Sequence, residues 1–220
     1  MGNKSILMSI RPQYVAQILK GNKTIEVRKK FSKDYVGWVY IYCTKGKPYL
    51  NSLEYRGLKW FWLEDKDILG VTENSKKATN GFENGLYDRL NGKVVARFWC
   101  DKVSVIQFNS CPTIPTIAYT TFLDRYYSDT DLQKASCLNG NELMWYLGTD
   151  KEQVGYAIHI TKLEMFDKPK ELKEFYKVGA WKVFEEQFDS SYLKREQQEI
   201  MEELEQTITK APQSWCYIEE

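Results

Sequence analysis

The apolar and polar positions along the chain predict short alternating elements rather than long runs of one kind. Ser5–Ile10 alternates around its apolar residues, which is typical of a strand. The next segment, Pro12–Lys20, carries apolar residues at helical spacing and begins with a proline that suits a first helical turn. Gly21 follows it as a natural helix end. The first 21 residues therefore predict a strand followed by a short amphipathic helix.

The same patterns predict further elements. Strands are expected at Lys23–Lys30, Trp38–Thr44, Val94–Val105, Tyr156–Phe166 and Ser214–Ile218. Helices are expected around Ile117–Tyr127, Glu142–Leu147 and Tyr192–Ile208, the second of them with Asn139 and Glu142 at capping-box spacing. Residues 45–91 show no regular spacing of apolar and polar positions. This order excludes a regular doubly wound fold and predicts an α+β fold around a mixed sheet or small barrel.

Composition narrows the class of protein. The chain has 220 residues, of which 43% are hydrophobic and 28% charged, so it can bury a core and is not intrinsically disordered. No apolar stretch approaches the roughly 20 residues that span a bilayer. The first residues, Met1–Ser5, lack the apolar region of a signal peptide. We therefore expect a cytoplasmic protein that does not bind membranes.

Metal and cofactor chemistry find little support in the sequence. The five cysteines are widely spaced without a Cys-x-x-Cys pair, and His159 is the single histidine. A glycine-rich loop that cradles phosphates is also absent. We expect reduced cysteines, no metal and no cofactor.

The charge is unevenly distributed. Residues 1–60 carry 12 lysines and arginines against 3 acidic residues, although the whole chain has a formal net charge of +1. A basic N-terminal part favours a local anion-binding face. The alternative is that the acidic C-terminal part folds back and neutralises it.

Polar residues gather in the segment from Lys20 to Arg28. Period-two alternation places Ile25 and Val27 on one face of the expected strand, with Thr24, Glu26 and Arg28 on the other. Glu26 and Arg28 would project about 6–7 Å apart, and Lys23 can swing to the same side. The carboxylate could accept hydrogen bonds from a base, while the cations could bind phosphate or a carbonyl oxygen. The alternative is a surface row of ion pairs on an edge strand.

Gly21-x-Lys23-x-x-Glu26-x-Arg28, with the strand and helix before it, resembles the signature of the ASCH family. Further segments resemble a bacterial branch of that family: Gly92–Arg97, Tyr156–Ile160, Phe166–Leu172 and Ala211–Tyr217. The resemblance covers roughly residues 4–48, 92–176 and 211–219. It implies an α+β, PUA-like mixed β-barrel with peripheral helices. It also implies one domain over residues 1–220, with insertions at about 49–91 and 177–210.

The resemblance further implies binding of nucleic acid, RNA before DNA, or of a nucleoside-like ligand, in a cleft beside the first helix. The motif residues that would mark this cleft are Gly21, Lys23, Thr24, Glu26 and Arg28. Candidate phosphate contacts are Arg11, Lys20, Lys29, Lys30 and Lys33. Trp215 is the first candidate for stacking on a base, Tyr42 and Trp145 are weaker ones, and all three could instead be core residues. His159 lies in a matching strand and could line the cleft.

Two enzyme alternatives stay open, although we expect binding without catalysis. Some small ASCH proteins resemble amidohydrolases of N4-acetylcytidine that use a lysine at the position of Lys23 and a threonine nucleophile at that of Glu26. Thr24 stands two residues too early, displaced by about 6–7 Å along a strand. In a ribonuclease, Glu26 could serve as a base beside Lys23 or Arg28. Protein partners are not readable, although Tyr192–Ile208 could present an apolar stripe to one.

Overall fold

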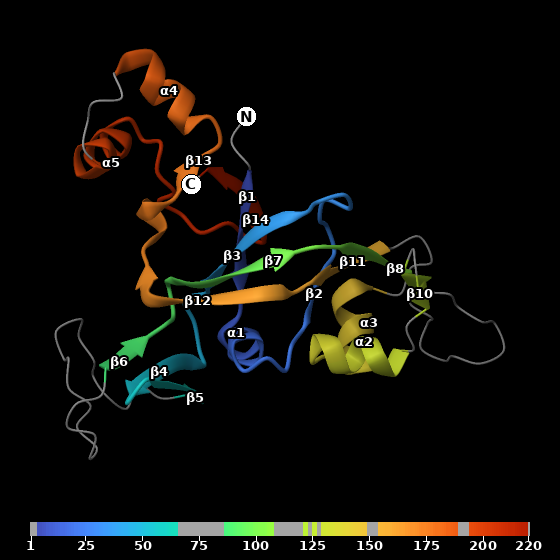
Figure 1. The fold of residues 1–220 in the computed structure, drawn as a ribbon. Helices are drawn as coiled ribbons and strands as arrows, with labels where there is room; N and C mark the ends of the chain where they lie inside the picture. Colours follow the sequence, from blue (N-terminus) through green and yellow to red (C-terminus); the bar gives the residue numbers. More distant parts are fainter. Residues whose placement is uncertain are drawn as a thin grey trace. The chain divides into compact units, whose positions relative to one another are not determined.

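The computed structural model describes residues 4–65, 86–107, 121–122, 125–126, 129–148, 154–188 and 194–219 (Figure 1). These residues form an α+β fold built on mixed and antiparallel sheets, as the sequence predicts. The chain divides into two compact units. The larger comprises residues 1–16, 38–97 and 164–220, and the smaller comprises residues 17–37 and 98–163. The expectation of one domain with two insertions stays a prediction.

A six-stranded sheet supplies most strands of the larger unit, in the order β12-β7-β3-β1-β14-β13. Its strands are β1 (Ser5–Ile10), β3 (Gly37–Cys43), β7 (Val94–Cys100), β12 (Thr161–Lys170), β13 (Tyr176–Lys177) and β14 (Trp215–Glu219). β1 pairs in parallel with β3 and antiparallel with β14, and all six of its residues are buried. A central strand with both faces covered needs a nearly continuous apolar sequence, which explains Ser-Ile-Leu-Met-Ser-Ile. α1 (Pro12–Leu19) follows β1 directly.

Two predicted strands are each divided in two. The run Val94–Val105 forms β7 and then β8 (Val103–Gln107), and the run Tyr156–Phe166 forms β11 (Val154–His159) and then β12. In both cases the two strands belong to different sheets. Apolar alternation continues across a bend, so it does not reveal where a strand leaves its sheet. In the part of the chain that the structure describes, the six-stranded sheet ends at β12 and β13, and the expected closed barrel is not seen.

The segment 45–91, for which the sequence predicts no regular element, contains a three-stranded antiparallel sheet with the strand order β5-β4-β6. Its strands are β4 (Tyr49–Tyr55), β5 (Leu58–Glu64) and β6 (Leu86–Arg89). The hairpin between the first two turns at Arg56 and Gly57, which both have positive φ angles of 53° and 76°. Two left-handed residues make the tight turn that matches the twist of antiparallel strands. Gly57 suits this turn, whereas Arg56 is an uncommon residue for a positive φ, so the pair is only a weak sequence signal for the hairpin.

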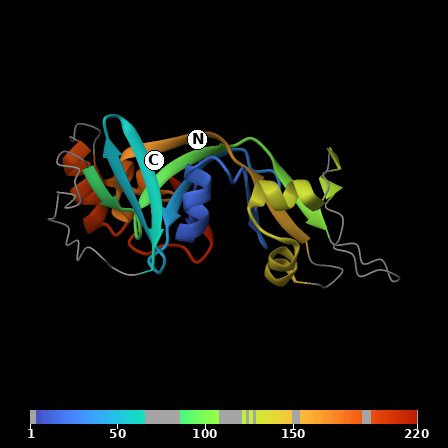
Figure 2. The same cartoon turned by 90° about the horizontal axis from the view of Figure 1, so that it is seen from below.

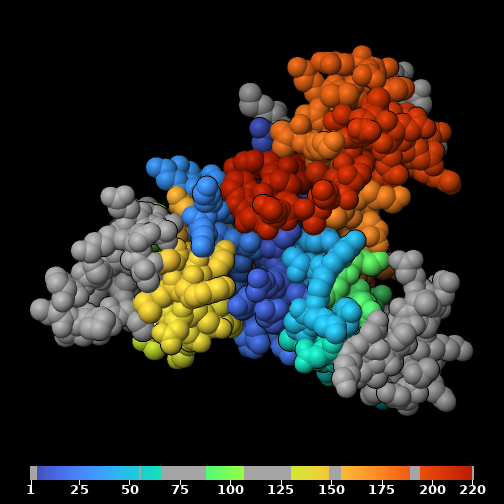
Figure 3. Space-filling view, turned by 180° about the vertical axis from the view of Figure 1, so that it is seen from behind, coloured from blue at the N-terminus to red at the C-terminus, as the bar shows by residue number. Residues whose placement is uncertain are grey.

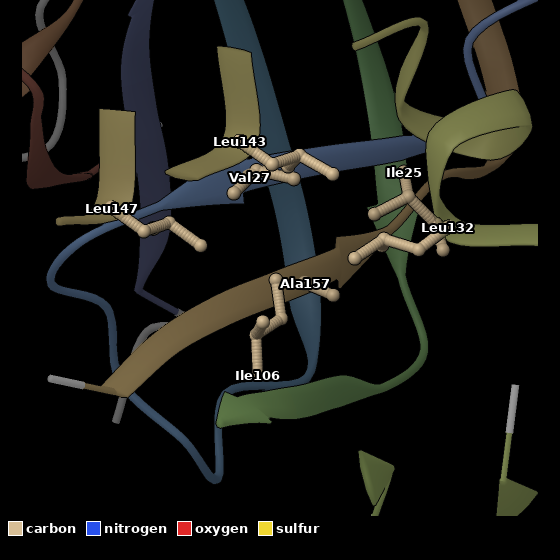
Figure 4. Packing of buried hydrophobic residues seen from close by; sticks show 7 residues of the cluster. All are labelled: Ile25, Val27, Ile106, Leu132, Leu143, Leu147 and Ala157. Carbon is tan, nitrogen blue, oxygen red and sulfur yellow. The ribbon is translucent and has the colours of Figure 1, made fainter. Parts of the chain in front are cut away.

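The smaller unit packs two helices on a three-stranded sheet of order β2-β11-β8, with β2 spanning Ile25–Arg28. Both helices, α2 (Asp129–Ser136) and α3 (Gly140–Leu147), lie on the same face of that sheet (Figure 2). Their apolar contacts with it are drawn in Figure 4 and involve Ile25, Val27, Ile106, Leu132, Leu143, Leu147 and Ala157. The predicted capping box of α3 is confirmed, since the Asn139 side chain accepts a hydrogen bond from the Glu142 amide at 2.9 Å.

The remaining helical predictions are only partly confirmed. Within Ile117–Tyr127 the described residues form two short strands, β9 (Thr121–Phe122) and β10 (Arg125–Tyr126), so the helix is wrong there; the rest lies outside the described residues. The last predicted helix is the shorter α5 (Lys194–Glu203). Met201 of α5 is buried against residues of α4 (Ala180–Gln187). The apolar face of α5 therefore packs inside the larger unit. A short 3₁₀ turn, η1 (Leu172–Glu174), precedes β13. Among the described residues, no helix is long and apolar enough to cross a membrane.

Candidate functional site

The motif begins at a tight helix end within the smaller unit. Gly21 adopts a positive φ of 75°, and its amide donates to the Ile18 carbonyl at 2.9 Å. The Asn22 amide donates to the Gln17 carbonyl, also at 2.9 Å. This pair of bonds is the Schellman arrangement, which stops a helix at a left-handed residue and favours glycine there. The chain therefore turns sharply into β2, and Lys23 stands at the corner.

Glu26 and Arg28 project from the same face of β2, as the alternation predicts. Ile25 and Val27 face the helices of the smaller unit, so the next residues along the strand point to the opposite side. The Arg28 Nε lies 3.0 Å from Glu26 Oε1, and the Lys23 Nζ lies 3.3 Å from Glu26 Oε2. Each oxygen of the carboxylate is thus in contact with a different cation. The structure brings together the three charged residues of the motif, which we call the buried network.

Lys23 also binds the end of a helix. Its Nζ donates to the carbonyl of Ser136, the last residue of α2, at 2.5 Å. The carbonyls of a last helical turn carry partial negative charge and have no partner within the helix, so a cation stabilises them. The ammonium group therefore bridges the carboxylate of Glu26 and the C-terminal end of α2.

The backbone beside Lys23 reinforces this junction. The Thr24 amide donates to the Ala135 carbonyl at 2.8 Å, and the Thr24 carbonyl accepts from the Ile160 amide at 2.9 Å. Cys137, the residue after the end of α2, has a positive φ of 53°. The last two carbonyls of α2, those of Ala135 and Ser136, are thus both bound by the motif. Ser136 acts through its backbone, so no side-chain signal in the sequence could have identified it.

All three members of the network are buried. Relative exposures are 2% for Lys23, 6% for Glu26 and 8% for Arg28, so the alternative of a surface ion-pair row is wrong. A buried charge is tolerated only when it is paired and hydrogen-bonded. Glu26 is paired with two cations, and Lys23 is paired with Glu26 and donates a hydrogen bond to the Ser136 carbonyl. The arrangement anchors β2 to α2 and leaves one excess positive charge.

Exposed cations flank the network on both sides. Lys20 precedes it, and Lys29, Lys30 and Lys33 follow it; all four are exposed, as are Gly21 and Thr24. The Lys29 Nζ lies 5.6 Å from the ring centroid of Tyr146 in α3. The segment of residues 20–33 therefore presents these four lysine side chains to solvent, while the buried network lies between them in the sequence. We call these four residues the exposed lysines.

His159 lies on the other face of the sheet. It pairs directly with Ile25 across β2 and β11, whereas Glu26 pairs with Ile158. Directly opposed residues share a face, so His159 points to the helix-covered side, away from Glu26 and Arg28. Its Nε2 lies 3.0 Å from the buried Ser104 Oγ. Burial lowers the pKa of His159, which favours the neutral ring.

Three other predicted residues belong to the larger unit. Arg11 is exposed between β1 and α1. Trp215 is half-buried in β14, with its ring edge-on to Tyr217 at 5.5 Å. Tyr42 is 3% exposed and belongs to the core, which is the alternative that the sequence left open for it. Trp145, in the smaller unit, is 86% exposed and is therefore not a core residue.

The sequence missed one charged cluster of the larger unit. Arg97 in β7 places its guanidinium 4.1 Å from the Trp38 ring centroid, donates to the Tyr40 hydroxyl at 3.0 Å and pairs with Glu164 at 2.8 Å. Its neighbours come from β3 and β12, so only strand pairing brings them together. In the described ranges, no three histidine, cysteine or acidic side chains are grouped as metal ligands.

Comparison with known proteins finds a coarse structural likeness. The chain is similar to the crystal structure of ASCH from Zymomonas mobilis, with 12% identity and a TM-score of 0.41, over 93% of this chain and 96% of that one. A Tyr-to-Phe mutant of that protein matches at 11% identity and a TM-score of 0.41, covering 93% and 99% of the two chains. No protein-family model and no curated protein matches the chain. Both solved structures are of ASCH, the family whose signature the motif resembles.

Proposed function

We propose that the protein binds nucleic acid, RNA in preference to DNA, through the exposed lysines of the smaller unit. The observation that carries this proposal is the division of charge within residues 20–33. Lys23, Glu26 and Arg28 are buried and paired, whereas Lys20, Lys29, Lys30 and Lys33 face solvent. Phosphate contacts with exposed lysines supply most of the salt-dependent affinity for nucleic acid.

The buried network has a positioning role in this proposal. Lys23 donates to the end of α2, and Glu26 is shared between two cations, so the three side chains hold the basic segment in one shape. A fixed segment loses less conformational freedom when it binds, which favours affinity. Glu26 is 6% exposed, so we assign base recognition to exposed groups such as Thr24 rather than to this carboxylate.

The ASCH-like motif supports the same class of ligand, since that resemblance implies nucleic acid or a nucleoside-like molecule. The single domain with insertions at about 49–91 and 177–210 and the cytoplasmic location remain part of the proposal. Hydrolysis by Lys23 and Glu26 has no observation in its favour. The two side chains are paired with each other, and Lys23 also binds a helix end, so the geometry favours binding.

The test is a fluorescence-anisotropy titration with a short single-stranded RNA at several salt concentrations. We expect the wild-type affinity to fall steeply with salt. The triple variant Lys29→Ala/Lys30→Ala/Lys33→Ala should bind at least tenfold more weakly at low salt. Its salt slope should be smaller by about 2, since each phosphate contact with a single strand contributes about 0.7. All three residues are exposed, so the fold should persist.

The matched control removes the same charge from the larger unit. Lys168, Lys194 and Lys210 are also exposed, and their triple alanine variant should bind like wild type. Equal losses of RNA affinity in both variants would show that overall charge alone causes the effect, and this would refute the site. Absence of RNA binding by wild type at low salt would reject the polymer, and a nucleoside panel, assayed for binding and hydrolysis, would then identify a small ligand.

A further inference from the structure

Helix α3 carries an aromatic side chain that the fold does not use. Leu143 and Leu147 of this helix are buried against the sheet, whereas Trp145 is 86% exposed. Burying a large aromatic ring is among the strongest apolar contributions to stability. The smaller unit gains almost none of it from Trp145. In Figure 3 the atoms of α2 and α3, drawn in yellow, are visible on the face shown.

Exposed cations lie in the same unit as Trp145. The neighbouring Tyr146 is half-buried, and its ring centroid lies 5.6 Å from Lys29 Nζ. This contact places Lys29, one of the exposed lysines, beside α3. Lys134, in the last turn of α2, is also exposed. Cations and an exposed aromatic ring are therefore combined within the same unit.

We propose that Trp145 is a stacking platform for an unpaired base of single-stranded nucleic acid, whose phosphates contact the exposed lysines. This inference rests on the proposed function and names its ligand more closely. Lysines alone would bind any polyanion, including a duplex. A solvent-exposed indole adds a surface on which any base can stack, and a base reaches it only when it is not stacked within a helix. Positive charge with an exposed ring thus matches a flexible single strand.

The experiment compares Trp145→Ala and Trp145→Phe with wild type, using the same single-stranded RNA and a duplex of equal length. Trp145→Ala should weaken single-strand binding by about 5- to 150-fold, the range for loss of one stacked base. Trp145→Phe should recover most of the loss because it retains an aromatic face. The salt slope should stay unchanged, since no charge is removed. Trp60→Ala is the matched control, because Trp60 is 45% exposed in the larger unit.

Each outcome separates the two proposals. Wild-type affinity in Trp145→Ala, together with weak binding by the lysine variant, would overturn the platform and retain the basic site. Equal weakening of single-strand and duplex binding by Trp145→Ala would also overturn it. Loss of affinity in Trp60→Ala to the same degree would show that Trp145 has no special role. If wild type binds no RNA at low salt, the proposed function itself fails.

Discussion

Two charged clusters of this protein stabilise their ionic groups in different ways. In the smaller unit, Lys23, Glu26 and Arg28 are buried, and each oxygen of the carboxylate contacts its own cation. In the larger unit, Arg97 stacks on Trp38 and pairs with Glu164, whose side chain is 50% exposed. Water solvates part of the second cluster, whereas the first depends almost entirely on its own partners and a helix carbonyl.

The difference predicts how the two clusters respond to mutation. Removing one member of a buried network leaves its partners charged in a medium that solvates them poorly. Removing one member of an exposed pair lets water take its place. The buried network should thus be sensitive to single changes, and the Arg97 cluster should be tolerant. Three predictions test this contrast, and a fourth concerns the pH dependence of stability.

The largest effect is expected from Glu26→Ala, which leaves Lys23 and Arg28 buried without their carboxylate. Loss of one partner of a buried ion pair costs about 3–5 kcal/mol of the free energy of unfolding. Urea denaturation followed by circular dichroism measures the loss. The control, Glu164→Ala, should cost about 1 kcal/mol or less because its pair is partly exposed. Equal losses for the two variants would contradict the contrast.

Replacing the whole network should recover much of that stability. In Lys23→Met/Glu26→Leu/Arg28→Met no buried charge remains, and apolar groups of similar size occupy the space. Such replacements are often neutral or stabilising, so the triple variant should exceed Glu26→Ala by at least about 2 kcal/mol in the same urea experiment. A triple variant less stable than Glu26→Ala would show that specific hydrogen bonds, such as that to Ser136, dominate.

Arg97→Ala should cost about 1–2 kcal/mol. The variant loses stacking on Trp38, worth about 0.5–1 kcal/mol at a partly exposed site, and the bonds to Tyr40 and Glu164. Arg97→Lys keeps the charge but not the planar group, so it should recover only part of the loss. Thermal unfolding of the three proteins compares them. A loss above about 3 kcal/mol for Arg97→Ala would place this cluster in the same class as the buried network.

The smallest effect concerns pH. Burial lowers the pKa of His159 in the folded protein, so the unfolded chain binds the proton more readily. The stability that depends on a neutral ring is therefore fully present at pH values above the ordinary pKa of about 6.5. It is lost as the pH falls below that value. The free energies of unfolding from urea denaturation at pH 7.5 and 5.5 should differ more for wild type than for His159→Gln, by less than about 1.4 kcal/mol per pH unit. An identical pH dependence of both proteins would contradict this assignment.

Several local features were predictable because neighbouring residues decide them. Gly21 ends the first helix, and Glu26 and Arg28 share a strand face, since both follow from backbone geometry. The capping box at Asn139 and Glu142 is likewise a local interaction. The Arg56-Gly57 turn was equally local, yet its hairpin was not predicted because the flanking residues lack a simple alternation.

Other features depended on contacts between distant residues. The bonds of Lys23 and Thr24 to the end of α2 join residues more than 100 positions apart, and the acceptors are backbone carbonyls that every residue has. The separation of His159 from Glu26 depends on the register between β11 and β2. The division of two apolar runs between sheets depends on which partner each strand meets.

The amino-acid sequence by itself determined the α+β class, the position of the charged motif and the strand face on which Glu26 and Arg28 lie. Backbone periodicity and glycine conformation are sufficient for these features. Only the tertiary structure decided that Lys23, Glu26 and Arg28 are buried while Lys29, Lys30 and Trp145 remain exposed. Burial depends on what packs over a side chain, and periodicity assigns a residue to a face without saying what covers that face.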